Sequence, residues 1–239
     1  MAQTAIPQPA STVVLARPDD RGAFEIFMNR RPEEMDTYAG IYVFPGGRVE
    51  ATDWSEQTLG LVTGMSPIEA QHILGGESEP ARCLGHWVAA VRELFEEAGI
   101  HMFVPQTGAR SNFALGDIFY RLAEKRAALQ LGKLDFPTLL MGEELLCDLG
   151  RLRYFFHRVT PAHYPVRFDT RFYLAALPPD QTPLQVSEEV SESLWISPQA
   201  ALERQQAGSF AMMPPTIAVL RTLLEQPTWV GLCDRFHLQ

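Results

Sequence analysis

The sequence predicts a single α/β domain that carries helical insertions, and three observations support this. Short β-prone runs alternate with longer segments of helical periodicity along the 239 residues. Hydrophobic residues make up 46% of the chain and aromatic residues 10%, which is ample for a buried core. The sequence contains no internal repeat and no low-complexity linker, so we expect one domain over residues 1–239.

The first part of the chain predicts three strands. Thr12–Ala16 and Phe24–Met28 are β-prone runs on either side of the turn-rich sequence RPDDRG, which predicts an antiparallel hairpin. Ile41–Phe44 is a further strand candidate, and it ends at Pro45-Gly46-Gly47. Strand-like runs return later, at Tyr154–Val159, Arg171–Ala176 and Val190–Ile196.

The clearest helical pattern runs from Leu84 to Ala98, where apolar side chains recur at steps of three and four residues. Gly99 follows as the expected helix stop. A second helical region is expected at about 112–149, with a break near Asp135-Phe136-Pro137. The remaining helices are expected at 67–74, 198–206 and 215–224, the last two closing the chain.

Charge and cysteine content limit the function. A formal net charge of −9 argues against a general binder of nucleic acid or of membrane surfaces. Cys83, Cys147 and Cys233 are far apart and lack CxxC spacing, so we expect reduced, structural thiols. The first sixteen residues contain no Lys or Arg, and no apolar run approaches the roughly 20 residues of a membrane span. We therefore expect a cytoplasmic protein.

The stretch RELFEEAGI, residues 92–100, places Glu93, Glu96 and Glu97 within one helical turn. Like charges on neighbouring positions lower the stability of an isolated helix by roughly a few tenths of a kcal/mol. One interpretation is a solvated acidic face; the other is a site for a hard divalent cation, which prefers carboxylate oxygens. Ala89 and Ala90 precede the carboxylates on the same face, and we expect their small size to let a bulky ligand approach.

Together with FPGG at 44–47, this stretch resembles the signature of the Nudix hydrolases, G-x5-E-x7-R-E-U-x-E-E-x-G-U, where U is aliphatic. The matching residues are Gly47, Arg92, Glu93, Leu94, Glu96, Glu97, Gly99 and Ile100. Asp53 stands at the position of the first glutamate. Asp53 and Arg92 are 39 positions apart instead of eight, so about 31 residues are inserted, at about 54–84.

A long insertion at this place resembles the peroxisomal coenzyme A diphosphatase branch of the family and its bacterial relatives. The longer connection costs only about 1.4 kcal/mol of loop-closure entropy. We therefore expect the insertion to leave the loop and the helix undisturbed. Deleting much of it should change substrate choice or dimer formation more than core stability.

The resemblance implies a Nudix-type α/β/α sandwich with a mixed sheet, and a site for Mg²⁺ or Mn²⁺. Its metal ligands would be the carbonyl of Gly46 and the carboxylates of Glu93, Glu96 and Glu97. Arg92 is expected to orient a neighbouring glutamate. The catalytic base is expected to be Glu93 first, then Glu188 or Glu189 in VSEEVSE, which could also be ordinary solvated acids.

The substrate-binding candidates are less specific. Five arginines lie between residues 151 and 171 against one acid, and arginine suits phosphate groups. Arg158, Arg167 and Arg171 are candidates for the substrate phosphates, unless they only cover exposed strand faces. Phe44, like Tyr42 and Phe168, could stack on adenine, line an acyl channel or belong to the core. Residues 159–175 and MMPPT at 212–216 also resemble the long-insertion branch, without a role that the residues themselves define.

The leading hypothesis is a metal-dependent diphosphatase that splits coenzyme A or acyl-coenzyme A into 3′,5′-ADP and a 4′-phosphopantetheine product. One alternative keeps the chemistry and changes the substrate to a nucleoside diphosphate-sugar, a dinucleotide or a damaged nucleotide. Another is a catalytically silent, nucleotide-sensing domain. A small-molecule diphosphate is the expected partner, and a homodimer is left open.

Overall fold

The structure is a computed structural model, and it describes residues 5–34, 39–76, 78–106, 116–184 and 190–238. Its main sheet has seven strands in the order β10-β2-β1-β9-β8, with β3 paired to β2 and β4 paired to β1. β1 and β9 run parallel and the other pairs run antiparallel, so the sheet is mixed. The strands are β1 (Gln8–Pro18), β2 (Phe24–Arg30), β3 (Tyr42–Val43), β4 (Gly46–Arg48), β8 (Arg153–Val159), β9 (Phe168–Ala176) and β10 (Glu192–Ile196).

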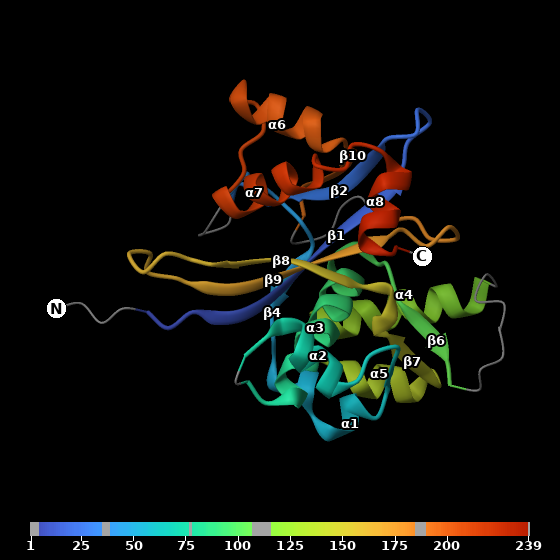
Figure 1. The fold of residues 1–239 in the computed structure, drawn as a ribbon. Coiled ribbons are helices and arrows are strands. Elements are labelled where there is room, and N and C mark those ends of the chain that lie inside the picture. Colours follow the sequence, from blue (N-terminus) through green and yellow to red (C-terminus); the bar gives the residue numbers. More distant parts are fainter. Residues whose placement is uncertain (1–4, 35–38, 77, 107–115, 185–189, 239) are drawn as a thin grey trace.

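Helices cover both faces of this sheet (Figure 1). On one face lie α6 (Pro198–Gln206), α7 (Pro214–Leu223) and α8 (Trp229–Phe236). The other face carries α1 (Glu56–Leu59), α2 (Pro67–Leu74), α3 (Pro80–Ala98), α4 (Gly116–Gln130) and α5 (Phe136–Gly142). A second sheet, in the order β5-β7-β6, joins this layer with β5 (Val62–Thr63), β6 (Phe103–Pro105) and β7 (Leu145–Asp148). The α/β/α arrangement with a mixed sheet confirms the predicted fold class.

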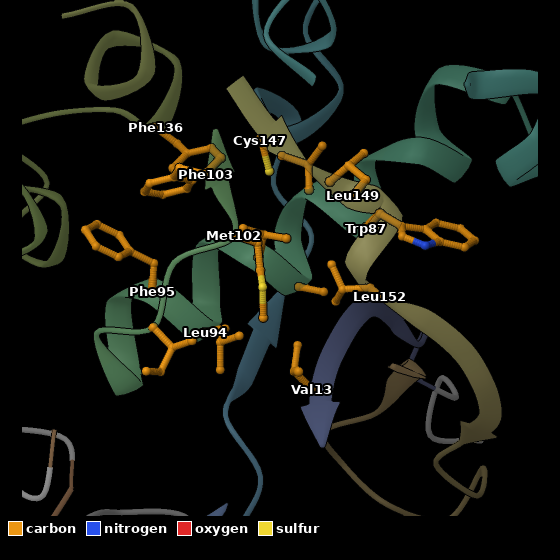
Figure 2. Packing of buried hydrophobic residues seen from close by; sticks show 14 of the residues in the cluster. Val13, Trp87, Leu94, Phe95, Met102, Phe103, Phe136, Cys147, Leu149 and Leu152 are labelled. Atoms are coloured by element: carbon orange, nitrogen blue, oxygen red, sulfur yellow. The ribbon is translucent and has the colours of Figure 1, made fainter. Parts of the chain in front are cut away.

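Both faces of β1 are buried, which explains why its central residues are continuously apolar. Val13 and Leu15 belong to the core cluster on the α3 side, whereas Val14 and Ala16 belong to the cluster under α7. The predicted hairpin is confirmed, since β1 and β2 are antiparallel neighbours with Ala16 opposite Ile26. Figure 2 shows the α3-side cluster, where Trp87 and Phe95 contribute large side chains to the packing.

The predicted Ile41–Phe44 strand shrinks to β3, and the chain then forms β4 at the diglycine instead of a simple stop. The helix predicted from Leu84 begins one turn earlier, at Pro80, and ends as expected. Gly99 adopts a left-handed φ of 69°, and its N–H donates to the carbonyl of Phe95. The helices predicted at 67–74, 198–206 and 215–224 are also confirmed, to within one residue.

The region predicted as helical at about 112–149 is only partly so. α4 and α5 occupy much of it, residues 112–115 lie outside the described part, and residues 145–148 form strand β7. Leu145 and Cys147 are buried while their neighbours are half-buried, which is the two-residue alternation of a strand. The prediction that two helices close the chain is wrong, because α8 follows α7.

The insertion at about 54–84 contributes to the core, which argues against the expectation that its deletion would spare core stability. It contains α1, β5 and α2; β5 pairs with β7, and α2 packs against α3. Leu61 and Ala70 from this segment are buried in the α3-side cluster. Its removal would therefore expose the buried face of α3, and we now expect a loss of stability.

The small residues of α3 do not face a ligand. Ala89 and Ala90 are fully buried, and α3 packs closely on β1 and β4 along this helix. His86 is buried too, with its Nδ1 3.2 Å from Ser11 Oγ. The small side chains allow the strands, instead of a substrate, to approach the helix.

The three cysteines, Cys83, Cys147 and Cys233, carry free thiols, as expected. Within the described ranges, the helices are all too short or too polar to cross a bilayer.

Ala70→Asp tests whether the insertion is structural. The substitution places an unpaired carboxylate in the core, so the free energy of unfolding should fall by about 3 kcal/mol or more. Ile73→Asp on the same helix is the control, because Ile73 is 44% exposed. Urea denaturation of both variants measures the difference, and equal stabilities would contradict a structural insertion.

His86→Asn tests the burial of His86. Burial lowers the pKa of His86 to about 3 from its ordinary value of 6.5. The unfolded chain therefore takes up a proton below about pH 6.5 that the folded chain refuses, and acidification destabilises the wild type. Between about pH 7 and pH 5, the variant should gain about 2 kcal/mol of unfolding free energy relative to wild type. The exposed His72→Asn, on helix α2, is the control variant.

Candidate metal and diphosphate site

Strand β4 presents its main chain to helix α3, and the hydrogen bonding of the β1–β4 ladder explains why. Val13 N–H donates to the carbonyl of Pro45 at 2.8 Å, so this opposed pair carries a ladder bond. Bonded and non-bonded pairs alternate along an antiparallel ladder. Gly46 and Arg48 are therefore in non-bonded pairs, and their N–H and C=O groups point away from β1.

Helix α3 supplies partners for these groups. Gly46 N–H donates to Glu97 Oε2 at 3.2 Å, and the carbonyl of Arg48 accepts from Arg92 Nη2 at 2.9 Å. The ladder alternation turns the carbonyl of Gly46 to this same side. The main chain at Gly46 thus lies beside the acidic turn of the helix, as the metal-ligand prediction requires.

The two glycines are needed for this close approach. A Cβ added at Gly47 would lie 2.3 Å from Glu93 Oε1, and one at Gly46 would lie 2.5 Å from the carbonyl oxygen of Ser11. Both distances are far below contact distance; a larger residue at Gly46 would push the strand from the main chain of β1, and one at Gly47 would displace the carboxylate of Glu93. The diglycine allows Glu93 and Glu97 to pack against the bend.

Arg92 is the centre of the site's ion-pair network. Its Nε and Nη2 atoms donate to the two carboxylate oxygens of Asp53 at 2.9 and 3.0 Å. Its Nη1 donates to Glu93 Oε1 at 2.8 Å and to Glu96 Oε1 at 3.4 Å. Arg92 is 6% exposed and Asp53 only 1%. The orienting role of Arg92 stays a prediction, and this bidentate anchor is the geometry that such a role needs.

The network leaves an excess of negative charge. Asp53, Glu93 and Glu96 surround the single guanidinium of Arg92, and Glu97, on the same turn of α3, accepts from Gly46 at the strand bend. Burial raises the pKa of Glu93 to about 7 and also raises the pKa of Glu96, although Arg92 opposes both shifts. A further cation would favour the ionised forms of both glutamates.

The donor types fit a hard divalent cation, since they are carboxylate and carbonyl oxygens. As placed, however, the side chains of the described residues do not converge into a cluster of three or more metal-ligating groups. Glu93 is engaged by Arg92, and Glu97 by Gly46. The residues that would hold the ion are the Gly46 carbonyl, Glu93 and Glu97, with Glu96 beside them.

A cavity of about 280 Å³ opens at this site. Gly46 and Glu97 line it, and Glu97 is the one acid among its described lining residues. Arg31 and Arg158 also line it, while most other lining side chains are apolar or hydroxyl-bearing. The cavity therefore combines the carboxylate of Glu97 with two arginines and an apolar wall, a lining that suits an anionic organic substrate.

The substrate-binding candidates divide between this cavity and other places. Phe44 and Phe168 line the cavity together with Arg158, although Phe44 is otherwise part of the core. The other two predicted arginines lie away from it. Arg167 donates to the carbonyls of Thr160 and Ala5, and Arg171 forms an ion pair with Asp169. Alternation along β9 explains this, because the cavity takes the even-numbered residues of that strand.

One further candidate, Tyr42, has no part in the cavity as described. Tyr42 stacks on Phe210 in the core. Glu188 and Glu189, the later candidates for the base, lie outside the described residues.

Several residues of the site were not predicted from the sequence. Arg31 and Thr216 line the cavity, and Arg126 donates to the carbonyl of Glu96 at 2.7 Å from α4. The signal for Thr216 was present, since it ends the MMPPT segment whose role was unassigned. Residues 159–161 and Tyr164, from the other unassigned segment, also line the cavity.

Comparison with known proteins gives one family. The sequence model of the NUDT19 Nudix domain matches residues 70–223, which is more than half of the chain. A Caenorhabditis elegans protein named nudix hydrolase 7 is 26% identical over 227 residues, which cover 95% of this chain and 63% of that protein. The acyl-coenzyme A diphosphatase NUDT19 of Gallus gallus is 27% identical over 80% of this chain and 59% of its own length. The chain thus spans about 60% of these relatives.

A solved structure agrees with these relatives. The crystal structure of a NUDIX hydrolase from Alicyclobacillus acidocaldarius superimposes with a TM-score of 0.74 and 28% sequence identity. The match covers 95% of this chain and 96% of that one, so it includes the insertion as well as the main sheet.

Asp53→Asn tests the anchor of Arg92. The substitution removes the charge that pairs with a buried guanidinium, so the free energy of unfolding should fall by about 3 kcal/mol. Glu25→Gln is the matched control, because Glu25 pairs with Arg17 at a site where both side chains are partly exposed. That change should cost no more than about 1 kcal/mol. Urea denaturation measures the free energy of unfolding of both variants. Similar losses would contradict the claim that Asp53 anchors Arg92.

Proposed function

The chain belongs to the Nudix hydrolase family, and we propose that it hydrolyses the diphosphate linkage of coenzyme A or acyl-coenzyme A. The products would be 3′,5′-ADP and 4′-phosphopantetheine or its acylated form. The carrying observation is the acidic turn of α3 on the Gly46-Gly47 bend, beside a cavity that holds Arg31 and Arg158. The likeness to an acyl-coenzyme A diphosphatase supports the substrate.

The described residues suit the parts that this reaction needs. A divalent cation, when bound, would offset the charge of the diphosphate and lower the pKa of a water molecule. The chain contributes the anchored Arg92, whose Nη1 donates to Glu93 Oε1 beside the bend. A general base must come within hydrogen-bond reach of the attacking water, and Glu93 lies beside the residues that would hold the ion. This supports Glu93 as the first candidate for the general base.

The cavity favours an organic diphosphate over inorganic pyrophosphate. Phe44, Phe168 and Phe172 give it an apolar wall, and Arg158 on β8 supplies positive charge. Nucleoside diphosphate-sugars and dinucleotides share the diphosphate, so a substrate panel has to separate them from coenzyme A. A silent nucleotide sensor would have no chemical need for the retained glutamates.

Glu97→Gln tests the reaction. The purified protein is incubated with coenzyme A, an acyl-coenzyme A, a nucleoside diphosphate-sugar and a dinucleotide, each with Mg²⁺ or Mn²⁺. Chromatography measures 3′,5′-ADP and the other products. We expect release from coenzyme A compounds, and a loss of kcat of at least about a hundredfold in the variant, because a cation ligand is removed.

Glu124→Gln on the exposed face of α4 is the control, and it should keep wild-type turnover. Hydrolysis of other panel compounds without release of 3′,5′-ADP would contradict coenzyme A as the substrate but would support a diphosphatase activity. Turnover of Glu97→Gln near the wild-type level would reject the assignment of the acidic turn.

A further inference from the structure

The cavity beside Glu97 also contains two polar groups, Arg31 and Thr216, whose hydrogen bonding the described residues leave incomplete. We propose that Arg31 and Thr216 form a subsite for a phosphate monoester carried by the nucleotide half of the substrate. The inference rests on the proposed function for its ligand, and it concerns a second phosphate that is separate from the diphosphate being cleaved.

Thr216 is the first observation. Its side chain lines the cavity, the residue is only 7% exposed, and no partner for its hydroxyl is found among the described residues. The hydroxyl oxygen retains some solvent contact, since it is not among the buried atoms that lack a partner, so a ligand in the cavity could reach it. An unpartnered hydroxyl that borders a cavity indicates a ligand group that would complete its hydrogen bonding.

The position of Thr216 in helix α7 is the second observation. The helix begins at Pro214, its N-cap Met213 provides no side-chain cap, and Pro214 and Pro215 have no N–H. The N–H of Thr216 lies in the first turn, where helical N–H groups lack partners inside the helix. Thr216 thus offers an N–H and a hydroxyl at the positive end of the helix dipole, which favours an anion.

Arg31 is the third and independent observation. It follows strand β2 and lines the same cavity, and its Nε atom is buried without a hydrogen-bond partner among the described residues. Its neighbour Arg30, in contrast, forms an ion pair with Glu33. A buried guanidinium N–H without an acceptor is costly, and phosphate oxygens match the geometry of the guanidinium group.

The chemistry of the cavity selects the type of ligand. A pantetheine arm or an acyl chain carries no charge, so it would leave the N–H groups of Arg31 unpaired. A nucleotide with an additional phosphate monoester could place its base against Phe44 or Phe168 and its phosphate on Arg31 and Thr216. This assignment also gives a role to the MMPPT segment, which forms the start of α7.

The test compares coenzyme A with dephospho-coenzyme A, which lacks the phosphate monoester. The variants are Thr216→Val and Arg31→Gln, and kcat/KM is measured for both substrates. Wild type should prefer coenzyme A, and each variant should lose about ten- to a hundredfold on coenzyme A only. The controls are Thr222→Val and Arg221→Gln on α7, neither of which lines the cavity. Both should behave as wild type.

Equal losses on both substrates, or no preference in wild type, would overturn the subsite. If neither compound is hydrolysed, the proposed function fails, and binding decides the subsite separately. Calorimetry then compares 3′,5′-ADP with 5′-AMP on the intact protein. Tighter binding of 3′,5′-ADP that both variants abolish supports the subsite, whereas equal binding of the two nucleotides, or retention of the difference in the variants, overturns it.

Discussion

The bidentate ion pair between Arg92 and Asp53 is the interaction on which the site depends. Through it, one guanidinium joins three segments: the turn after β4, the strand β4 itself through the carbonyl of Arg48, and the acidic turn of α3. Breaking a buried pair by removing one partner leaves an uncompensated charge, which is strongly unfavourable. The position of Glu93 is therefore tied to the integrity of the pair and not only to its own helix.

The fold provides the surroundings in which that pair can form. Gly46 and Gly47 allow β4 to lie between β1 and α3, and the ladder leaves the outward main-chain groups of Gly46 and Arg48 available to the helix. The inserted segment packs on the opposite side of α3 and buries it, so the helix has little exposed surface apart from its acidic turn. The cavity then opens where that turn meets β8, β9 and the start of α7.

Much of this could be predicted from the sequence, because local patterns determine it. The helical periodicity of 84–98, the left-handed stop at Gly99 and the hairpin around RPDDRG all appear in the structure. The failures concern contacts between distant segments. Whether Arg31, Arg167 or Arg171 reaches the cavity depends on strand register, which a single sequence does not reveal. The sequence likewise does not reveal that the small side chains of Ala89 and Ala90 make room for strands and not for a ligand.

Asp53 and Arg92 are 39 positions apart in the sequence, and this separation affects how the site forms during folding. Their contact is non-local, so the ends of a chain segment that itself folds into several elements must be brought together before it can form. A chain whose inserted segment has not closed this loop lacks the Arg92–Asp53 pair and, with it, the link between β4 and the acidic turn of α3.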